Sequence, residues 1–330
     1  MRTIDWRDDH IVVIDQTKLP GGVVELTLTT VEELVIAIQR LAVRGAPALG
    51  AAGALGVALA ARASRDPDSD FDADVAALRA ARPTAVNLAH GVDRALARLA
   101  DGPDAVLAEA LDLLAEDGVC NRALGERGAN WLAELIDGPV AVHTHCNAGG
   151  LACVEWGTAL GVVRSLHDRG RLRHVYVDET RPLLQGARLT AWELAHLGVP
   201  HTLVADAAGP TVLARGLADA VVVGADRIVA NGDVVNKIGT YPLALAAARA
   251  GVPFVVAAPE STVDGTIPSG DQVEIEVRDG SELLAFGGTR TAPSGTPALN
   301  LAFDVTPADL VTAIVTEDRI VRPALGERPA

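Results

Sequence analysis

Cysteine, aromatic residues and basic residues are all scarce in this chain of 330 residues. Its 3 cysteines are too few for a disulfide framework and are expected to stay reduced in the cytoplasm. Aromatic side chains make up 3% of the residues, which argues against platforms that stack nucleic-acid bases. The 28 basic residues against 43 acidic ones give a net charge of −15, which disfavours a phosphate backbone as partner. We therefore expect a cytoplasmic protein without a nucleic-acid partner.

The sequence also has little that would attach it to a membrane. Residues 1–16 are polar and charged, unlike the apolar core of a signal peptide. The apolar stretch 50–61 is shorter than the roughly 20 residues that a helix needs to cross a bilayer. We expect no membrane partner. If the ligand is a small anion, the acidic excess requires that a few basic residues gather in one place.

The first part of the chain is predicted to be mainly helical. Two short β-type runs, 11–14 and 23–28, flank the turn-forming residues Pro20-Gly21-Gly22 and predict a hairpin. Apolar periodicity predicts several helices after the hairpin. They span residues 31–41, 47–65, 73–81, 85–99 and 105–136, the last with a break near Gly118.

Short apolar runs alternate with helical segments in the rest of the chain. Runs typical of buried strands occupy residues 140–144, 175–177, 202–204, 220–223 and 254–257. Helices are predicted at 151–168, 186–197 and 236–250, and a strand at 273–277 and a helix at 308–315 close the chain. This alternation is typical of a parallel sheet with helices on both faces. The sequence therefore predicts an α/β protein: a small, mainly helical domain with a β-hairpin (1–136), then a Rossmann-like catalytic domain (137–330).

The thiol of Cys146 follows the first of these strands. A helix predicted from Leu151 would place the thiol near a helix N-terminus, which favours the thiolate. The same residue could instead be a small buried side chain, as cysteine often is. His143, His145 and Cys146 are also potential zinc ligands, but no second metal-binding motif accompanies them, so we expect no metal.

Two further strands are followed by charged residues. Asp226 comes after the apolar strand 220–223, where partial burial would raise its pKa into the range useful for acid–base catalysis. Capping of a turn or pairing with Arg227 is an equally good explanation of this aspartate. The polar segment 178–188 follows the strand at 175–177, and its arginines could bind an anion or neutralise their own acidic neighbours. Ligands of open parallel sheets bind at these strand ends.

Three basic residues stand at predicted helix starts. Arg44 precedes Gly45-Ala46-Pro47 at the start of the predicted helix 47–65, and Arg82 likewise precedes a proline before the predicted helix 85–99. Lys237 lies in a polar loop that leads into a helix. Free backbone N–H groups at a helix start bind phosphate. A lysine at that end opposes the helix dipole unless an anion is bound. Together these residues predict one phosphate-binding active site.

An ordered set of motifs covers nearly the whole chain. Its members are 15–20, 44–50, 82–88, 145–149, 179–194, 223–227, 231–241, 290–293 and 302–307. This set resembles the methylthioribose-1-phosphate isomerase family. That family is related to ribose-1,5-bisphosphate isomerase and to the regulatory subunits of the eukaryotic translation-initiation guanine-nucleotide exchange factor.

The resemblance implies a homodimeric enzyme of methionine salvage that uses neither a metal nor an organic cofactor. Its reaction would convert S-methyl-5-thio-α-D-ribose 1-phosphate to S-methyl-5-thio-D-ribulose 1-phosphate. The family's acid falls on Asp226, expected to protonate the ring oxygen, and its thiol falls on Cys146, expected near the hydrogen transfer between C2 and C1. Its substrate-binding positions fall on Arg44, Gly45, Ala46, Arg82, Gln185, Asn236 and Lys237.

Other functions on the same fold stay open. The sugar could be 5-deoxyribose 1-phosphate or ribose 1,5-bisphosphate, although a second phosphate would require a further basic cluster. The chain could also be a non-catalytic regulatory subunit, but the joint presence of Cys146, Asp226, Asn236 and Lys237 favours an enzyme. A nucleotide-dependent dehydrogenase is disfavoured, because no predicted strand is followed by Gly-x-Gly-x-x-Gly.

Overall fold

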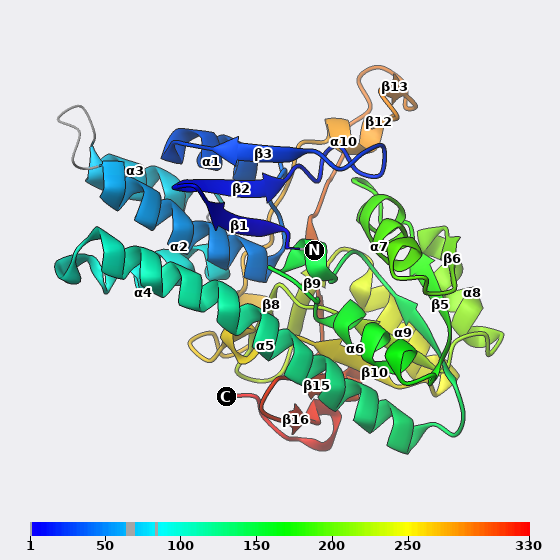
Figure 1. Ribbon diagram of the computed structural model, residues 1–330. Helices are drawn as coiled ribbons and strands as arrows, with labels where there is room; N and C mark the ends of the chain where they lie inside the picture. Colours follow the sequence, from blue (N-terminus) through cyan, green and yellow to red (C-terminus); the bar gives the residue numbers. More distant parts are fainter. Residues whose placement is uncertain (1, 64–69, 83–84) are drawn as a thin grey trace.

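The computed structural model describes residues 2–63, 70–82 and 85–330 and begins with a small sheet packed on helices (Figure 1). The strands β1 (Ile4–Arg7), β2 (His10–Ile14) and β3 (Glu25–Leu28) form an antiparallel three-stranded sheet. The helices are α1 (Val31–Gln39), α2 (Ala46–Ala63), α3 (Phe71–Ala80), α4 (Val86–Leu96) and α5 (Pro103–Leu135). The predicted hairpin is confirmed as β2 and β3, whereas β1 was missed because its four residues are too few to show a clear alternation.

Helix α2 is the central helix of this part. By length and composition it could cross a membrane, but 78% of it is buried inside the structure, as in the core helix of a globular protein. It packs closely on α4, where a Cβ atom at Gly91 would lie 1.9 Å from the carbonyl oxygen of Gly50. Only glycine therefore allows the two backbones to approach this closely.

Gly91→Ala is expected to destabilise the protein by about 2–3 kcal/mol, because the added methyl group forces α2 and α4 apart. Chemical denaturation measures this change. Gly22→Ala is the matched control, since a Cβ atom at Gly22 meets nothing within 4 Å. Equal unfolding free energies for the two variants would contradict the close approach of the helices.

Helix α5 runs unbroken from one part of the molecule to the other (Figure 1). The predicted break near Gly118 is wrong. A Cβ atom at Gly118 would lie 2.5 Å from Oε1 of Glu155, so this glycine allows close packing rather than a turn. Along α5, Leu114 belongs to the apolar core of the N-terminal part and Leu124 to the core beneath the large sheet. The domain boundary at residue 136 stays a prediction.

The second part is built on a seven-stranded sheet. Its strands, in spatial order, are β16 (Ile320–Val321), β15 (Ala313–Val315), β10 (Phe254–Ala257), β7 (Ala220–Val223), β4 (Val140–Thr144), β5 (Leu172–Asp178) and β6 (His201–Val204). All neighbouring strands are parallel except β15 and β16. Counted along the chain, the six parallel strands have the order 3-2-1-4-5-6 of a doubly wound fold. This order confirms the predicted Rossmann-like sheet.

Helices cover both faces of this sheet (Figure 1). They are α6 (Ala159–Asp168), α7 (Ala191–His196), α8 (Gly209–Ala214) and α9 (Thr240–Ala250). Val222 and Val255 pack in the apolar cluster that includes residues of α5, α6 and α7, whereas Val221 and Val256 pack in the cluster with α8 and α9. Successive strand residues point to opposite faces, so the central strands β7 and β10, which are covered on both faces, are apolar along their whole length.

Two predicted helices begin later than expected. The helix predicted from residue 151 begins at Ala159, because Trp156 and Gly157 adopt positive φ values of 72° and 92°. The helix predicted from residue 236 begins at Thr240. The residues before it form β9 (Val234–Lys237), which belongs to a four-stranded sheet with β11 (Val263–Asp264), β8 (Arg227–Val229) and β14 (Phe303–Thr306).

The C-terminal region differs most from its prediction. The helix predicted at 308–315 is wrong, because residues 313–315 form β15 in the large sheet. The strand predicted at 273–277 is reduced to one isolated bridge between Val277 and Leu301. The remaining short elements are α10 (Ser281–Leu284), β12 (Ala285–Phe286) and β13 (Thr289–Arg290).

Candidate active site

The order of the parallel strands reverses between β4 and β7, which lie side by side in the sheet. Cys146 lies two residues beyond the end of β4, and Asp226 lies three residues beyond the end of β7. Loops at such a reversal diverge and leave a crevice, which is where doubly wound proteins bind their ligands. The strand order therefore brings the thiol and the carboxyl group to one place.

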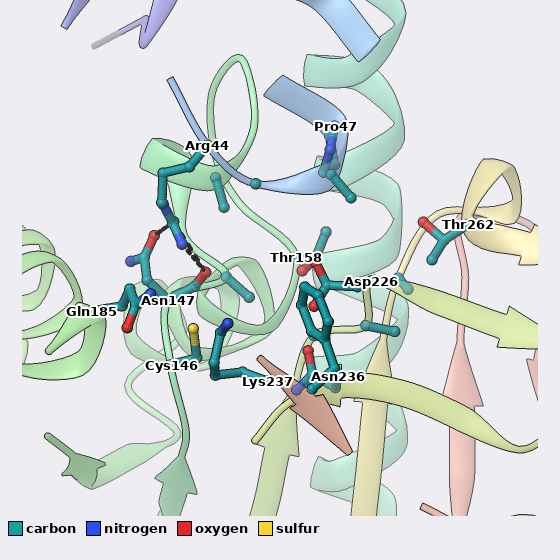
Figure 2. Close-up of a pocket in the computed structure, with 18 of the residues that line it drawn as sticks. Arg44, Pro47, Cys146, Asn147, Thr158, Gln185, Asp226, Asn236, Lys237 and Thr262 are labelled. Atoms are coloured by element: carbon teal, nitrogen blue, oxygen red, sulfur yellow. Dashed lines mark hydrogen bonds between the residues drawn. The ribbon is translucent and has the colours of Figure 1, made fainter. Parts of the chain in front are cut away.

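A cavity of about 800 Å³, open solvent at its mouth included, occupies this edge of the sheet. Figure 2 shows Arg44, Cys146, Asp226 and Lys237 around it. All of the predicted site residues line this cavity: Arg44, Gly45, Ala46, Arg82, Cys146, Gln185, Asp226, Asn236 and Lys237. The structure thus brings together all nine residues of the predicted catalytic and substrate-binding set, while their individual roles stay predictions.

Cys146 is held in a strained backbone conformation by two threonines. Its φ is 60°, its N–H donates to Oγ1 of Thr180 (2.9 Å), and its carbonyl accepts from Oγ1 of Thr190 (2.6 Å). Because α6 begins only at residue 159, the helix start expected from Leu151 does not lie next to the thiol, and that argument for a thiolate does not apply. Burial raises the pKa of the Cys146 thiol, against the opposing effects of Lys237 and Arg44. Burial therefore favours the neutral thiol over the thiolate.

Asp226 stands immediately before β8, and its backbone N–H donates to the carbonyl of Val235 (2.9 Å). Burial raises the pKa of its carboxyl group, while the positive charges of Lys237, Arg82 and Arg44 partly oppose this shift. A raised pKa increases the protonated fraction near neutral pH. Asp226 can therefore donate a proton to a ligand in the cavity.

Lys237 is the last residue of β9, and its side chain reaches residues at the start of β14. Its Nζ donates to the carbonyl of Ala302 (2.9 Å) and lies 4.4 Å from the centre of the Phe303 ring. Burial lowers the pKa of the Lys237 amine, whereas Cys146 and Asp226 act to raise it. Because α9 begins at Thr240, Lys237 does not lie in the first turn of a helix, and the expected conflict with the helix dipole does not arise.

Arg44 joins the N-terminal part to the loop after β4. Its Nε donates to Oε1 of Gln16 (3.0 Å), and its Nη atoms donate to the carbonyl of Asn147 (3.3 and 3.2 Å) and to the Asn147 side chain (Figure 2). Asn147 in turn donates to Oε1 of Glu193 (2.7 Å). Gln16 and Asn147 were not predicted as site residues, although both lie inside motifs that the sequence analysis identified. They fix the direction of the guanidinium group.

The first turn of α2 offers backbone donors to the cavity. Gly45 has a φ of 96°, and a Cβ atom there would lie 2.4 Å from the carbonyl oxygen of Ala152, so glycine is required. The N–H groups of Ala46 and Ala48 have no acceptor within the helix, as at every helix start. This turn can therefore bind a phosphate group.

Arg82 reaches the cavity from the end of α3 rather than from a helix start. The next helix begins at Val86, and residues 83 and 84 lie outside the described part of the chain. Its Nη2 donates to Oε2 of Glu276 (3.2 Å), whose other oxygen accepts from Arg278 (3.1 Å). The charge of Arg82 is thus partly neutralised before any ligand binds.

Gln185 and Asn236 complete the predicted set. The buried Oε1 atom of Gln185 has no hydrogen-bond partner among the described residues. Asn236 donates through Nδ2 to Oγ1 of Thr240 (2.9 Å). Buried polar atoms are nearly always paired, so the side chain of Gln185 is suited to receive a hydrogen bond from a ligand.

The histidines near the cavity form a hydrogen-bond network. His143 and His145 each contact a different oxygen of Asp178 (both 2.9 Å), and Nε2 of His145 also contacts the carbonyl of Ile238 (2.8 Å). His145, Asp178 and Asp206 lie close enough to hold an ion, but Asp206 already accepts from two backbone N–H groups (both 2.7 Å). These contacts explain the cluster without an ion, and the expectation that no metal is needed stays a prediction.

Comparisons with known proteins agree with these features. The model of the initiation factor 2 subunit family matches residues 42–323. A methylthioribose-1-phosphate isomerase of Heliobacterium modesticaldum is 49% identical over 98% of this chain and 96% of its own length. A 5-deoxyribose 1-phosphate isomerase of Moorella thermoacetica is 50% identical over 97% of this chain and 94% of its own length. A probable bifunctional isomerase/dehydratase of Nocardia farcinica is 53% identical over the whole chain, which spans 61% of that relative's length.

Solved structures show the same relationship. The 5-methylthioribose 1-phosphate isomerase of Pyrococcus horikoshii superposes with a TM-score of 0.88 at 40% identity, covering 98% of this chain and 92% of the other. A chain described as translation initiation factor eIF-2B, subunit delta, from A. fulgidus superposes with a TM-score of 0.84 at 44% identity, covering 99% and 97%. This chain therefore belongs to the initiation factor 2 subunit family, together with the methylthioribose-1-phosphate isomerases.

Proposed function

We propose that this protein is an isomerase that converts S-methyl-5-thio-α-D-ribose 1-phosphate to S-methyl-5-thio-D-ribulose 1-phosphate in methionine salvage. The observation that carries the proposal is the meeting of a carboxyl group, a thiol and several cations in one cavity at the strand-order reversal. Relatives with 45–49% identity over almost the whole chain are named methylthioribose-1-phosphate isomerase.

The chemistry begins with the ring oxygen. Phosphate on C1 prevents the simple ring opening of a free aldose, so an acid must protonate the ring oxygen while the C1–O bond breaks. Asp226 supplies this proton, and the bonding electron pair leaves with the oxygen, which becomes the C4 hydroxyl. The positive charge that develops at C1 is next to the phosphate ester oxygen. The raised pKa of the Asp226 carboxyl supports its role as the acid.

A hydrogen must then move from C2 to C1. In a hydride shift it carries its electron pair to C1, and the C2 hydroxyl returns one proton to the carboxylate of Asp226 as the ketone forms. In the alternative route the carboxylate of Asp226 takes the C2 hydrogen as a proton, and the resulting enol phosphate gains a proton at C1 while its C2 hydroxyl loses one to form the ketone. We place the neutral thiol of Cys146 beside C1 and C2, since it lines the same cavity as Asp226.

Phosphate binding falls to the groups around the start of α2. The donors of Ala46 and the side chains of Arg44 and Lys237 are oriented by protein contacts before the ligand arrives. Such preorganisation reduces the entropy cost of binding. A helix start together with two cationic side chains is suited to bind a single phosphate dianion, even in a chain whose overall charge is negative.

The Moorella relative supports a second candidate, isomerisation of 5-deoxyribose 1-phosphate. Both reactions use the same acid and the same phosphate-binding groups, and the two sugars differ only at C5. Turnover of methylthioribose 1-phosphate, 5-deoxyribose 1-phosphate and ribose 1,5-bisphosphate, measured side by side, distinguishes the candidates. We expect the highest kcat/KM for methylthioribose 1-phosphate, and inactivity on all three sugars would overturn the proposal.

Deuterated water separates the two hydrogen-transfer routes. Deuterium at C1 of the product indicates exchange of a proton with solvent, and its absence indicates a direct shift or a shielded proton. We also propose that the protein is a cytoplasmic homodimer that binds neither nucleic acid nor membranes. Light scattering of the purified protein tests the dimer.

A further inference from the structure

The hydroxyl group of Thr262 is a buried polar group that the mechanism above does not use. Thr262 is 4% exposed and lines the cavity. Its Oγ1 atom has no hydrogen-bond partner within residues 2–63, 70–82 and 85–330. Leaving a buried hydroxyl unpaired costs free energy, so such groups are rare unless something outside the chain completes them. A ligand in the cavity can supply the missing partner.

The small four-stranded sheet fixes Thr262 on the Asp226 side of the cavity. Thr262 directly precedes β11, whose Val263 pairs in parallel register with Ile228 of β8. Asp226 directly precedes β8, so the two residues enter neighbouring strands from the same end. Figure 2 shows Thr262 and Asp226 on one side of the cavity and Gln185 on the opposite side.

The turn that carries Thr262 is firmly anchored. The backbone N–H of Thr262 donates to the carbonyl of Pro259 (2.9 Å). In the same turn, the carboxylate of Glu260 accepts from Arg319 (2.8 Å) and from Oγ1 of Thr316 (2.7 Å). These contacts hold the backbone while the hydroxyl hydrogen remains free to rotate. The Thr262 hydroxyl therefore offers the cavity both a hydrogen-bond donor and an acceptor, with its oxygen held in a fixed position.

We propose that Thr262 is a substrate-binding residue whose hydroxyl group hydrogen-bonds the sugar oxygen that Asp226 protonates. The inference rests on the proposed function. The ring oxygen of the closed sugar only accepts hydrogen bonds, whereas the C4 hydroxyl formed from it can also donate. A threonine hydroxyl suits both states, because it can donate to the first and accept from the second.

Three variants test this role. Thr262→Val keeps the shape of the side chain but removes the hydroxyl, and it is expected to lower kcat/KM for methylthioribose 1-phosphate about tenfold. Thr262→Ser keeps the hydroxyl and should restore kcat/KM to within about threefold of the wild-type value. Thr306→Val is the matched control, since Thr306 also has a buried, unpartnered Oγ1 but does not line the cavity. It should leave kcat/KM unchanged.

Measurement of Tm distinguishes a loss of substrate binding from a loss of folding stability in these variants. Both valine variants replace an unpaired buried hydroxyl by a methyl group, so both should keep or raise the wild-type Tm. Wild-type kcat/KM in Thr262→Val, or an equal loss in Thr306→Val, would overturn the role of Thr262 and leave the proposed function intact. A wild-type protein inactive on all three sugar phosphates would overturn the proposed function and this inference with it.

Discussion

Asp226→Asn should lower kcat for methylthioribose 1-phosphate by about 10³-fold or more while the protein still binds the sugar phosphate. An amide fills the same space but cannot protonate the ring oxygen, and general acid catalysis typically contributes factors of this size. Steady-state turnover measures the loss, and calorimetric titration of the variant measures the affinity that remains. The groups that we propose for phosphate binding, Arg44 and Lys237 among them, are unchanged in this variant.

The neighbouring Asp264→Asn is the control for this prediction. Asp264 lies on β11 and pairs with Arg227 (3.3 Å) outside the cavity lining, so its loss should change kcat only a few-fold. The wild-type pH profile provides an independent check. With Asp226 in its proposed role as the acid, we expect kcat/KM to fall as the pH rises through the raised pKa of its carboxyl group, and we expect this falling limb to disappear in Asp226→Asn. Retention of the limb would exclude Asp226 as the proton donor.

Cys146→Ala should lower turnover by about 10²-fold or more, because the side chain that we place beside the reacting carbons would lose its polarisable S–H group. Binding of the sugar phosphate should change much less. Cys120→Ala is the control, since Cys120 is half-buried in α5 and does not line the cavity. Near-normal turnover of Cys146→Ala would rule out a role for the thiol.

Alkylation tests the protonation state of this thiol. Burial raises the Cys146 pKa, and only the thiolate reacts with iodoacetamide, so inactivation should be slow at neutral pH and accelerate as the pH rises. Bound sugar phosphate should protect the enzyme. Rapid, pH-independent inactivation would instead indicate a preformed thiolate.

The parallel sheet could be predicted because its central strands are buried on both faces. Runs such as 220–223 are apolar throughout, and their alternation with helices determines the fold class. Two predictions were wrong for reasons that local sequence patterns do not show: the start of the helix at 151–168, and the position of Lys237 at the start of a helix. Positive φ values at Trp156 and the pairing of β9 with β14 depend on contacts between segments far apart in the chain.

The residues of the candidate site likewise fall into those that a local pattern indicates and those whose position depends on distant contacts. Cys146 and Asp226 became candidates because each follows a buried strand, and strand ends of a parallel sheet share one edge. The family resemblance then assigned their roles. Gln16, Asn147 and Thr262 were not recognised as site residues. Their positions depend on docking of the N-terminal part and on the small sheet, neither of which leaves a periodic signal in the sequence.

The unbroken α5 constrains how the protein can move. One end of this helix is packed in the N-terminal core and the other beneath the large sheet. Bending it would break main-chain hydrogen bonds and disturb both cores, so the two halves of the molecule cannot swing apart about it at low cost. We therefore expect substrate access and product release to depend on local displacement of the loops around the cavity, rather than on opening and closing of two rigid lobes.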